Sequence, residues 1–255
     1  MSEWVQAVVW GLVQGLTEFL PISSSGHLVV VPGFLGLDPP DLATSAVLHL
    51  GTLVAVLVYY RTDVARVLRF ASDASARKLL LLLIVGTLPS ALALVVEDRV
   101  EALQASTSAV GLALIATAGI LWFSERVQDR TGVVEGMTRR DAVLIGFAQL
   151  LAVIPGISRS GSTITASMWL GLEREEAARF SFLLGIPAIT AAGTLEGLGL
   201  LNGGGIPASA WLGVAVAAIS GYAAIALLLR ILTRVGLRPF ATYCAVVGAT
   251  AILFL

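Results

Sequence analysis

The chain has little charge and only one cysteine. Charged residues make up 13% of its 255 residues, whereas 57% are hydrophobic and the mean hydropathy is +0.90. Soluble domains carry about 25% charged residues, so this composition excludes an ordinary soluble fold. The single cysteine excludes a disulfide framework within the chain. The net charge of −1 gives no basic excess, so we expect no nucleic-acid partner.

Long apolar runs occupy most of the sequence. A transmembrane helix needs about 20 predominantly apolar residues, and six segments meet this requirement. They are roughly residues 42–60, 79–97, 107–124, 177–195, 209–229 and 239–255. We therefore predict an all-α, polytopic membrane bundle that forms a single domain over residues 1–255 and lies in the cell membrane.

Two further apolar stretches are interrupted in the middle. Residues 4–37 are broken at Pro21–His27, and residues 144–172 are broken at Pro155–Gly161. Each half is about 10–16 residues long, which is too short to span a bilayer. Non-helical backbone at membrane depth is tolerated only where protein or water satisfies it. These stretches therefore predict two re-entrant helical hairpins.

The two broken stretches align with each other without a gap at an offset of 135 residues. The identical pairs include glycine and polar positions that chance would not readily align. They are Gly11 with Gly146, Gln14 with Gln149, Ser23 with Ser158, Ser25 with Ser160, and Gly26 with Gly161. We predict one repeat over about 1–125 and a second over about 141–255, each with one hairpin and three spans. Because three is odd, the second repeat enters the membrane inverted, as in many transporters.

The distribution of basic residues orients this topology. Of the 16 Lys and Arg residues, Arg99 alone falls on one side of the membrane and Arg159 lies in the second break, which leaves fourteen on the other side. Cytoplasmic loops carry the excess of Lys and Arg. We therefore expect both termini to be non-cytoplasmic and the two broken tips to meet near the midplane.

Few polar side chains lie at membrane depth, and ionisable ones there are functional candidates. Glu18 and His27 flank the first break, Arg159 lies in the second, and we expect the three to converge on one cavity. Serine-rich breaks that precede helices favour phosphate, because N–H groups and the helix dipole point there, and Arg159 adds a planar fork. The expected substrate-binding residues are Ser23, Ser25, Ser158, Ser160, Thr163 and Gln14.

Structural roles compete with these functional ones. Arg159 could pair with Glu18 only to hold the hairpins together, and His27 could simply cap the second half-helix. His49 lies within an apolar span, so we expect a hydrogen-bonded core histidine away from both breaks. Gln14 and Gln149 could bridge helices.

Two motifs resemble those of a known family. Residues Gln14–His27 and Pro155–Thr163 are similar to the first and second signatures of the undecaprenyl-diphosphate phosphatase family of the bacitracin-resistance type, and Phe180–Leu184 with Pro187 also fits. The resemblance covers essentially the whole chain. It implies hydrolysis of a polyprenyl diphosphate to the monophosphate, which recycles the lipid carrier for cell-wall and peptidoglycan synthesis, and it implies the fold predicted above.

The resemblance also implies roles for residues. It carries function onto Glu18, Ser24, His27, Ser158, Arg159 and Thr163. Activation by Mg²⁺ or Ca²⁺ is expected, with Glu18 and the substrate phosphates as ligands. The family commonly has a second glutamate where this chain has Gln14, which puts a mechanism with two acidic metal ligands in doubt.

The chemical roles remain open at this stage. Arg159 would clamp the phosphates, and Ser24, His27 or a water molecule would attack, with Glu18 or His27 as base. A transporter or flippase for a polyprenyl phosphate would need the same anion pocket. The sequence does not decide the oligomeric state, a homodimer included.

Overall fold

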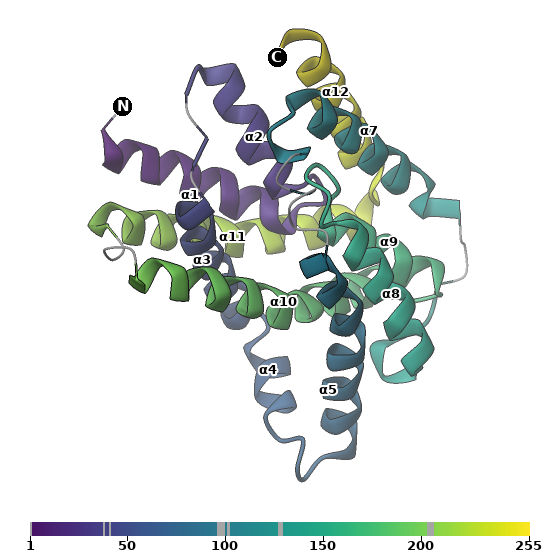
Figure 1. The fold of residues 1–255 in the computed structure, drawn as a ribbon. Coiled ribbons are helices and arrows are strands. Elements are labelled where there is room, and N and C mark those ends of the chain that lie inside the picture. The colour runs from purple at the N-terminus through teal and green to yellow at the C-terminus, as the bar shows by residue number, and fades with distance from the viewer. Residues whose placement is uncertain are drawn as a thin grey trace.

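The computed structural model describes residues 2–37, 39–40, 42–95, 100, 103–126, 130–202 and 207–255, and among these the regular secondary structure is helical, joined by turns and loops (Figure 1). The α-helices are α1 (Glu3–Phe19), α2 (Ser24–Leu35), α3 (Leu42–Tyr59), α4 (Arg61–Val67), α5 (Ala74–Thr87), α7 (Thr107–Phe123), α8 (Arg139–Leu151), α9 (Arg159–Trp169), α10 (Arg174–Asn202), α11 (Ala208–Arg234) and α12 (Arg238–Phe254). Short 3-10 helices are η1 (Leu88–Val95), η2 (Ser124–Arg126) and η3 (Val134–Gly136). The all-α prediction is confirmed for this part of the chain.

Several of these helices are long and apolar enough to cross a membrane. By length and hydropathy alone, Ala74–Ala93, Thr107–Arg126 and Ala208–Arg234 qualify. A fourth span is added if Thr44–Tyr59 and Arg61–Val67, which are bent by 84°, count as one. The helices therefore fit a membrane bundle, and the six predicted apolar segments correspond to α3, α5 with η1, α7, α10, α11 and α12.

The predicted segment 79–97 is not one continuous α-helix. The α-helix ends at Thr87, and the chain continues as the 3-10 helix η1 to Val95. Pro89 explains the change, since proline has no N–H to donate and its ring clashes with the preceding turn of an α-helix. Residues 96–97 of this segment, and Arg99, lie outside the described residues.

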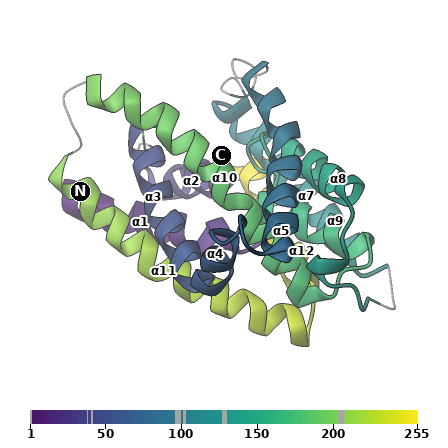
Figure 2. The same cartoon turned by 90° about the horizontal axis from the view of Figure 1, so that it is seen from below.

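Glycines let α1 and α11 approach closely. A Cβ added at Gly15 would lie 2.0 Å from the Ser220 hydroxyl and 2.6 Å from the Ala217 carbonyl oxygen, and one added at Gly11 would lie 2.6 Å from the Gly213 carbonyl oxygen. Small residues are the usual device for close helix packing in membranes. Figure 2 shows α1, α3 and α11 side by side. This packing fixes the C-terminal end of α1, where Glu18 lies.

The outer surface of the bundle carries large apolar side chains. Ile219 on α11 is 74% exposed and Leu253 on α12 is 73% exposed. Such side chains are costly to leave in water, whereas lipid accommodates them. The buried core lies on the inner faces, where Phe19 packs edge-on against Phe182 with ring centroids 5.4 Å apart.

Candidate active site

The two broken stretches meet at a cavity of ≈ 720 Å³. The first break separates α1 from α2, and the second separates α8 from α9. Their tips are in contact: Ser160 donates a hydrogen bond to the Leu20 carbonyl (3.1 Å), and a Cβ added at Gly26 would lie 3.1 Å from Gly156 Cα. The polar residues that line the cavity are Glu18, Ser23, Ser24, Ser25, His49, Thr87, Ser90, Gln149, Ser158 and Arg159.

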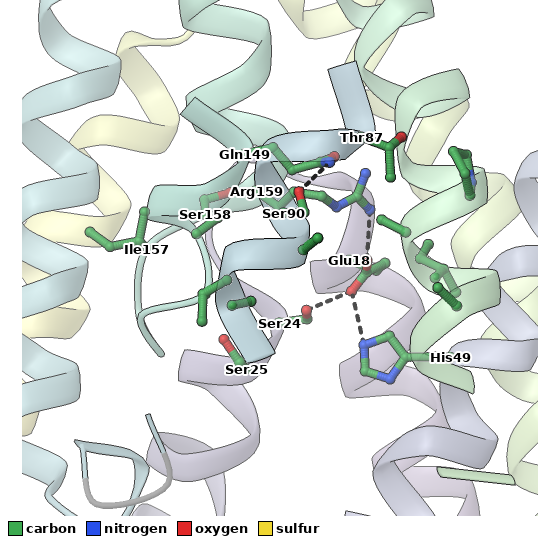
Figure 3. A pocket seen from close by; sticks show the side chains of 18 of the residues that line it. Glu18, Ser24, Ser25, His49, Thr87, Ser90, Gln149, Ile157, Ser158 and Arg159 are labelled. Carbon is green, nitrogen blue, oxygen red and sulfur yellow. Dashed lines mark hydrogen bonds and ion pairs between the residues drawn. The ribbon is translucent and has the colours of Figure 1, made fainter. Parts of the chain in front are cut away.

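Glu18 is the centre of the polar network (Figure 3). Its Oε1 accepts a hydrogen bond from Arg159 Nη2 at 2.7 Å. Its Oε2 accepts from Ser24 Oγ at 2.6 Å and from Gln14 Nε2 at 3.0 Å. Gln14 reaches Glu18 because residues four apart lie on the same face of a helix. Gln14 itself is fully buried and does not line the cavity.

The backbone of the first break presents Ser24 to Glu18. Ser23 has φ 70°, and it is the one non-glycine residue of the described chain with positive φ. Its hydroxyl caps α2 by accepting from Gly26 N at 3.3 Å. A non-glycine residue in this region persists only where its surroundings hold it there. Ser24 is thereby the first residue of α2, with its side chain directed at the carboxylate.

The second break is built in the same way. Ser158 caps α9 by accepting from Gly161 N at 3.1 Å, and Arg159 is the first residue of that helix. Thr117 of α7 holds the break, because its hydroxyl donates to the Gly156 carbonyl at 2.8 Å and accepts from Ser158 N at 3.1 Å. Arg159 therefore enters the cavity from a helix start that its neighbours fix.

Only some of the expected substrate-binding residues line the cavity. Ser23, Ser25 and Ser158 do so. Ser160 instead joins the two tips, as described above. Thr163 lies behind the site, where its hydroxyl bonds to the Arg159 carbonyl at 2.8 Å and to Ser181. In this geometry Thr163 supports Arg159 and has no access to the cavity.

His27 does not face the cavity, contrary to the expectation that it converges there with Glu18 and Arg159. Its Nδ1 lies 2.7 Å from the Ser23 carbonyl oxygen, and its Nε2 lies 2.8 Å from the Tyr243 hydroxyl. The ring also stacks on Tyr243 and is buried. Both ring nitrogens therefore have partners away from the cavity. The first turn of α2 directs Ser24 towards Glu18 and residue 27 away from it. The geometry agrees with the structural alternative, in which His27 braces α2.

His49 is part of the cavity wall, so the expectation of a core histidine away from both breaks is wrong. Its Nε2 lies 3.7 Å from Glu18 Oε2, and its side chain, which lines the cavity, is 33% exposed. Its Nδ1 lies 2.7 Å from the Ser45 carbonyl oxygen. His49 does lie within an apolar helix, as predicted, but the sequence could not show which face of α3 turns towards α1.

Helix α5, η1 and α8 add a second group of polar side chains. Gln149 Nε2 donates to Ser90 Oγ at 2.9 Å, and Thr87 lies one turn before Ser90. Thr87 and Ser90 did not stand out in the sequence, since isolated hydroxyl residues are common in apolar helices. The repeat register did mark Gln149, and its contact with Ser90 agrees with a role in bridging helices.

The side chains that line the cavity can supply only part of the ligands that a divalent cation needs. Glu18 is the one carboxylate that lines the cavity, and the described residues contain no group of three His, Cys, Asp or Glu side chains that could hold a metal. Mg²⁺ commonly binds through one or two protein ligands together with substrate phosphates. The residues therefore fit a cation that takes most of its ligands from phosphate and water.

Comparison with known proteins places this site in context. The sequence model of a family described as "Bacitracin resistance protein BacA" matches residues 7–250. A protein of Thermomicrobium roseum named "Undecaprenyl-diphosphatase" is 44% identical, over 99% of this chain and 98% of its own length. Proteins with the same name from Desulfosudis oleivorans (41% identical, 98% of each chain) and Methanosphaera stadtmanae (36% identical, 99% of this chain and 98% of its own) are also similar.

Proposed function

The chain belongs to the bacitracin resistance protein BacA family, and from this we propose that it is a membrane phosphatase that converts undecaprenyl diphosphate, or a polyprenyl diphosphate like it, to the monophosphate. The reaction would recycle the lipid carrier of cell-envelope glycan synthesis. The observation that carries the proposal is the arrangement at the cavity wall. A serine hydroxyl donates to a carboxylate at 2.6 Å, and the same carboxylate pairs with a guanidinium at 2.7 Å.

Ser24 is the nucleophile in this mechanism. Its Oγ attacks the terminal phosphorus, an Oγ–P bond forms, and the bond from that phosphorus to the bridging oxygen breaks. Polyprenyl monophosphate leaves with the bridging oxygen, while the hydroxyl proton passes to Glu18 Oε2 along the 2.6 Å hydrogen bond. Water then takes the phosphoryl group, Glu18 returns its proton to Ser24, and inorganic phosphate is released.

Arg159 binds and neutralises the phosphates. Its Nη2 is engaged by Glu18, whereas its Nη1 is buried against Gly185 and has no hydrogen-bond partner in the described part of the chain. Arg159 lines the cavity, so a phosphate bound there can form strong, charge-assisted hydrogen bonds with its guanidinium. Donors held ready for charge that develops in the transition state are a large contribution to catalysis. A divalent cation held by Glu18 and the phosphate oxygens would supply further charge neutralisation.

The prenyl tail leaves the cavity towards lipid between α5 and α10. A second cavity of ≈ 700 Å³ lies there, and it shares Ile84, Pro187 and Ala191 with the first. Its other lining residues are apolar except Thr190, and they come from α4 with the residue that follows it, α5 and α10. An apolar channel next to a polar site suits a molecule with a diphosphate head and a hydrocarbon tail.

The membrane arrangement that supports this function has six spans and two re-entrant hairpins. The two repeats, about 1–125 and 141–255, have inverted topology, and both termini are non-cytoplasmic. The gap-free offset of 135 residues and the distribution of Lys and Arg support this arrangement.

Phosphate release tests the proposal directly. Purified protein in detergent is incubated with undecaprenyl diphosphate and divalent cation, and inorganic phosphate and the lipid product are measured. We expect one phosphate released per lipid monophosphate formed. Binding of polyprenyl phosphate without any release would overturn the proposal and support the transporter alternative, which the names of the relatives do not favour.

A further inference from the structure

The unprotonated ring nitrogen of His49 faces the Glu18 carboxylate. Its Nδ1 lies 2.7 Å from the Ser45 carbonyl oxygen. A carbonyl oxygen can only accept, so Nδ1 carries the ring proton and the neutral ring has an unprotonated Nε2. That nitrogen lies 3.7 Å from Glu18 Oε2. Two electron-rich atoms thus face each other at the cavity wall.

The distance between His49 Nε2 and Glu18 Oε2 distinguishes a direct hydrogen bond from a shared metal ion. An N–H···O hydrogen bond spans about 2.7–3.2 Å, so 3.7 Å is too long for a shared proton. Bonds from Zn²⁺ to histidine nitrogen and carboxylate oxygen are about 2.0–2.2 Å long, so two ligands of one such ion can lie up to about 4 Å apart. The observed distance is within the range for a bridging ion.

The surroundings of His49 match those of a metal ligand. Metal-binding histidines usually donate their other ring N–H to a backbone carbonyl or a carboxylate, which fixes the tautomer and the ring orientation. The Ser45 carbonyl occupies this position. His49 is also reachable, since its side chain is 33% exposed, and Arg159 and Glu18 lie in the same cavity to receive phosphates beside it.

We propose that His49 Nε2 and the Glu18 carboxylate are the two protein ligands of the divalent cation, and that His49 takes the place of a second carboxylate. The remaining ligands are water and the phosphates of the substrate, and for those phosphates the inference rests on the proposed function. An imidazole ligand suits transition metals such as Zn²⁺ and Fe²⁺, whereas Ca²⁺ prefers oxygen ligands only, so a nitrogen in the site favours first-row transition metals, of which Mn²⁺ is the weakest binder, over Ca²⁺. The chain should therefore bind Mn²⁺ more tightly than Ca²⁺.

Pulsed EPR of bound Mn²⁺ tests the proposal without relying on activity. The protein, freed of any purification tag, is loaded with Mn²⁺ and methylenediphosphonate, a diphosphate analogue that does not hydrolyse. We expect ¹⁴N modulation from one imidazole, which changes to the ¹⁵N pattern when the protein is made with ¹⁵N-histidine. The assignment is simple because the chain has only two histidines.

Two variants assign the signal to one histidine. In His49→Gln the nitrogen signal should disappear and Mn²⁺ binding should weaken about tenfold or more. His27→Gln is the matched control and should keep the signal, because Ser23 and Tyr243 occupy both nitrogens of His27. Thermal unfolding of each variant shows whether it is folded.

Several results would overturn the inference. They are Mn²⁺ bound without nitrogen coupling in the unmodified protein, no Mn²⁺ bound at all, or a signal that His49→Gln retains. The first two need no variant, so a variant that fails to fold does not block the test. Phosphate release is measured on the same preparations: its absence from the unmodified protein would refute the proposed function and leave the result on the ligands standing.

Discussion

Glu18 Oε1 lies 2.7 Å from Arg159 Nη2, although 141 residues separate them in the sequence. The two side chains are only 6% and 16% exposed. A buried ion pair recovers its desolvation cost only with good geometry, and an apolar pair is often at least as stable. The pair is therefore poorly explained by stability alone. Its position at the cavity agrees with a site in which a carboxylate and a guanidinium act on the same phosphate.

Replacement of Ser24 by alanine tests the nucleophile. Ser24→Ala should reduce turnover about 10³-fold or more, because no other hydroxyl is hydrogen-bonded to Glu18 in the described structure. Ser25→Ala is the matched control, since Ser25 lines the same cavity but bonds to Ser23, and it should lose far less. Phosphate release and binding of the lipid substrate are measured for both. Substantial turnover in Ser24→Ala would favour attack by water.

Two substitutions in the ion pair separate charge from geometry. Arg159→Lys keeps the positive charge but removes the planar fork that can bind phosphate oxygens in pairs. Glu18→Gln keeps the shape but removes the proton acceptor. Each should reduce turnover about 10²–10³-fold while the protein still folds. Steady-state rates of phosphate release are measured for both variants in the same detergent, and thermal unfolding shows whether each variant is folded. Normal rates in both variants would contradict the mechanism.

The contact between α1 and α11 should not tolerate a methyl group. Gly15→Ala would place Cβ 2.0 Å from Ser220 Oγ and 2.6 Å from a backbone oxygen, so we expect a loss of about 1–3 kcal/mol in stability. Gly119→Ala is the control, because a Cβ there meets nothing within 4 Å, and alanine is the better helix former by up to about 1 kcal/mol. Thermal unfolding in detergent should show opposite shifts in Tm. Equal shifts would rule out this packing.

The apolar cavity between α5 and α10 should matter for long substrates. Ile84→Trp adds bulk where the two cavities join, so kcat/KM should fall more for a C55 diphosphate than for a C15 diphosphate. Ile219→Trp adds the same bulk on the outer face of α11, where residue 219 lines neither cavity. That variant should treat both chain lengths alike. A C55-to-C15 ratio unchanged by Ile84→Trp would exclude this path for the tail.

Labelling of single cysteines tests the topology. The natural Cys244 is buried, and Cys244→Ala provides the background. A membrane-impermeant maleimide on intact cells should label Ser2→Cys and Leu255→Cys. It should label Ser72→Cys, in the loop between α4 and α5, only after the cells are opened. Labelling of Ser72→Cys from outside would reverse the proposed orientation.

The sequence predicted the elements of the site better than their orientation. Breaks with proline and serine in apolar stretches, together with the repeat, were enough to bring Ser24, Glu18 and Arg159 together. The two histidines were predicted wrongly, and for one reason. Hydropathy reports depth along a helix, whereas the rotation of a helix about its axis depends on contacts with neighbours such as those of α3 with α1 and α11. His27 is near Glu18 in sequence and faces away, while His49 is distant in sequence and faces it.

Ser24 and Arg159 are each the first residue of the helix that follows a break, and they occupy the same position of the two repeats, because 159 − 24 = 135. A protein assembled from two identical halves would therefore have carried either two hydroxyls or two guanidiniums at this place. Phosphoryl transfer through a serine needs one of each. The proposed chemistry therefore depends on a difference between the two halves at this position, where one residue attacks the phosphate and the other binds it.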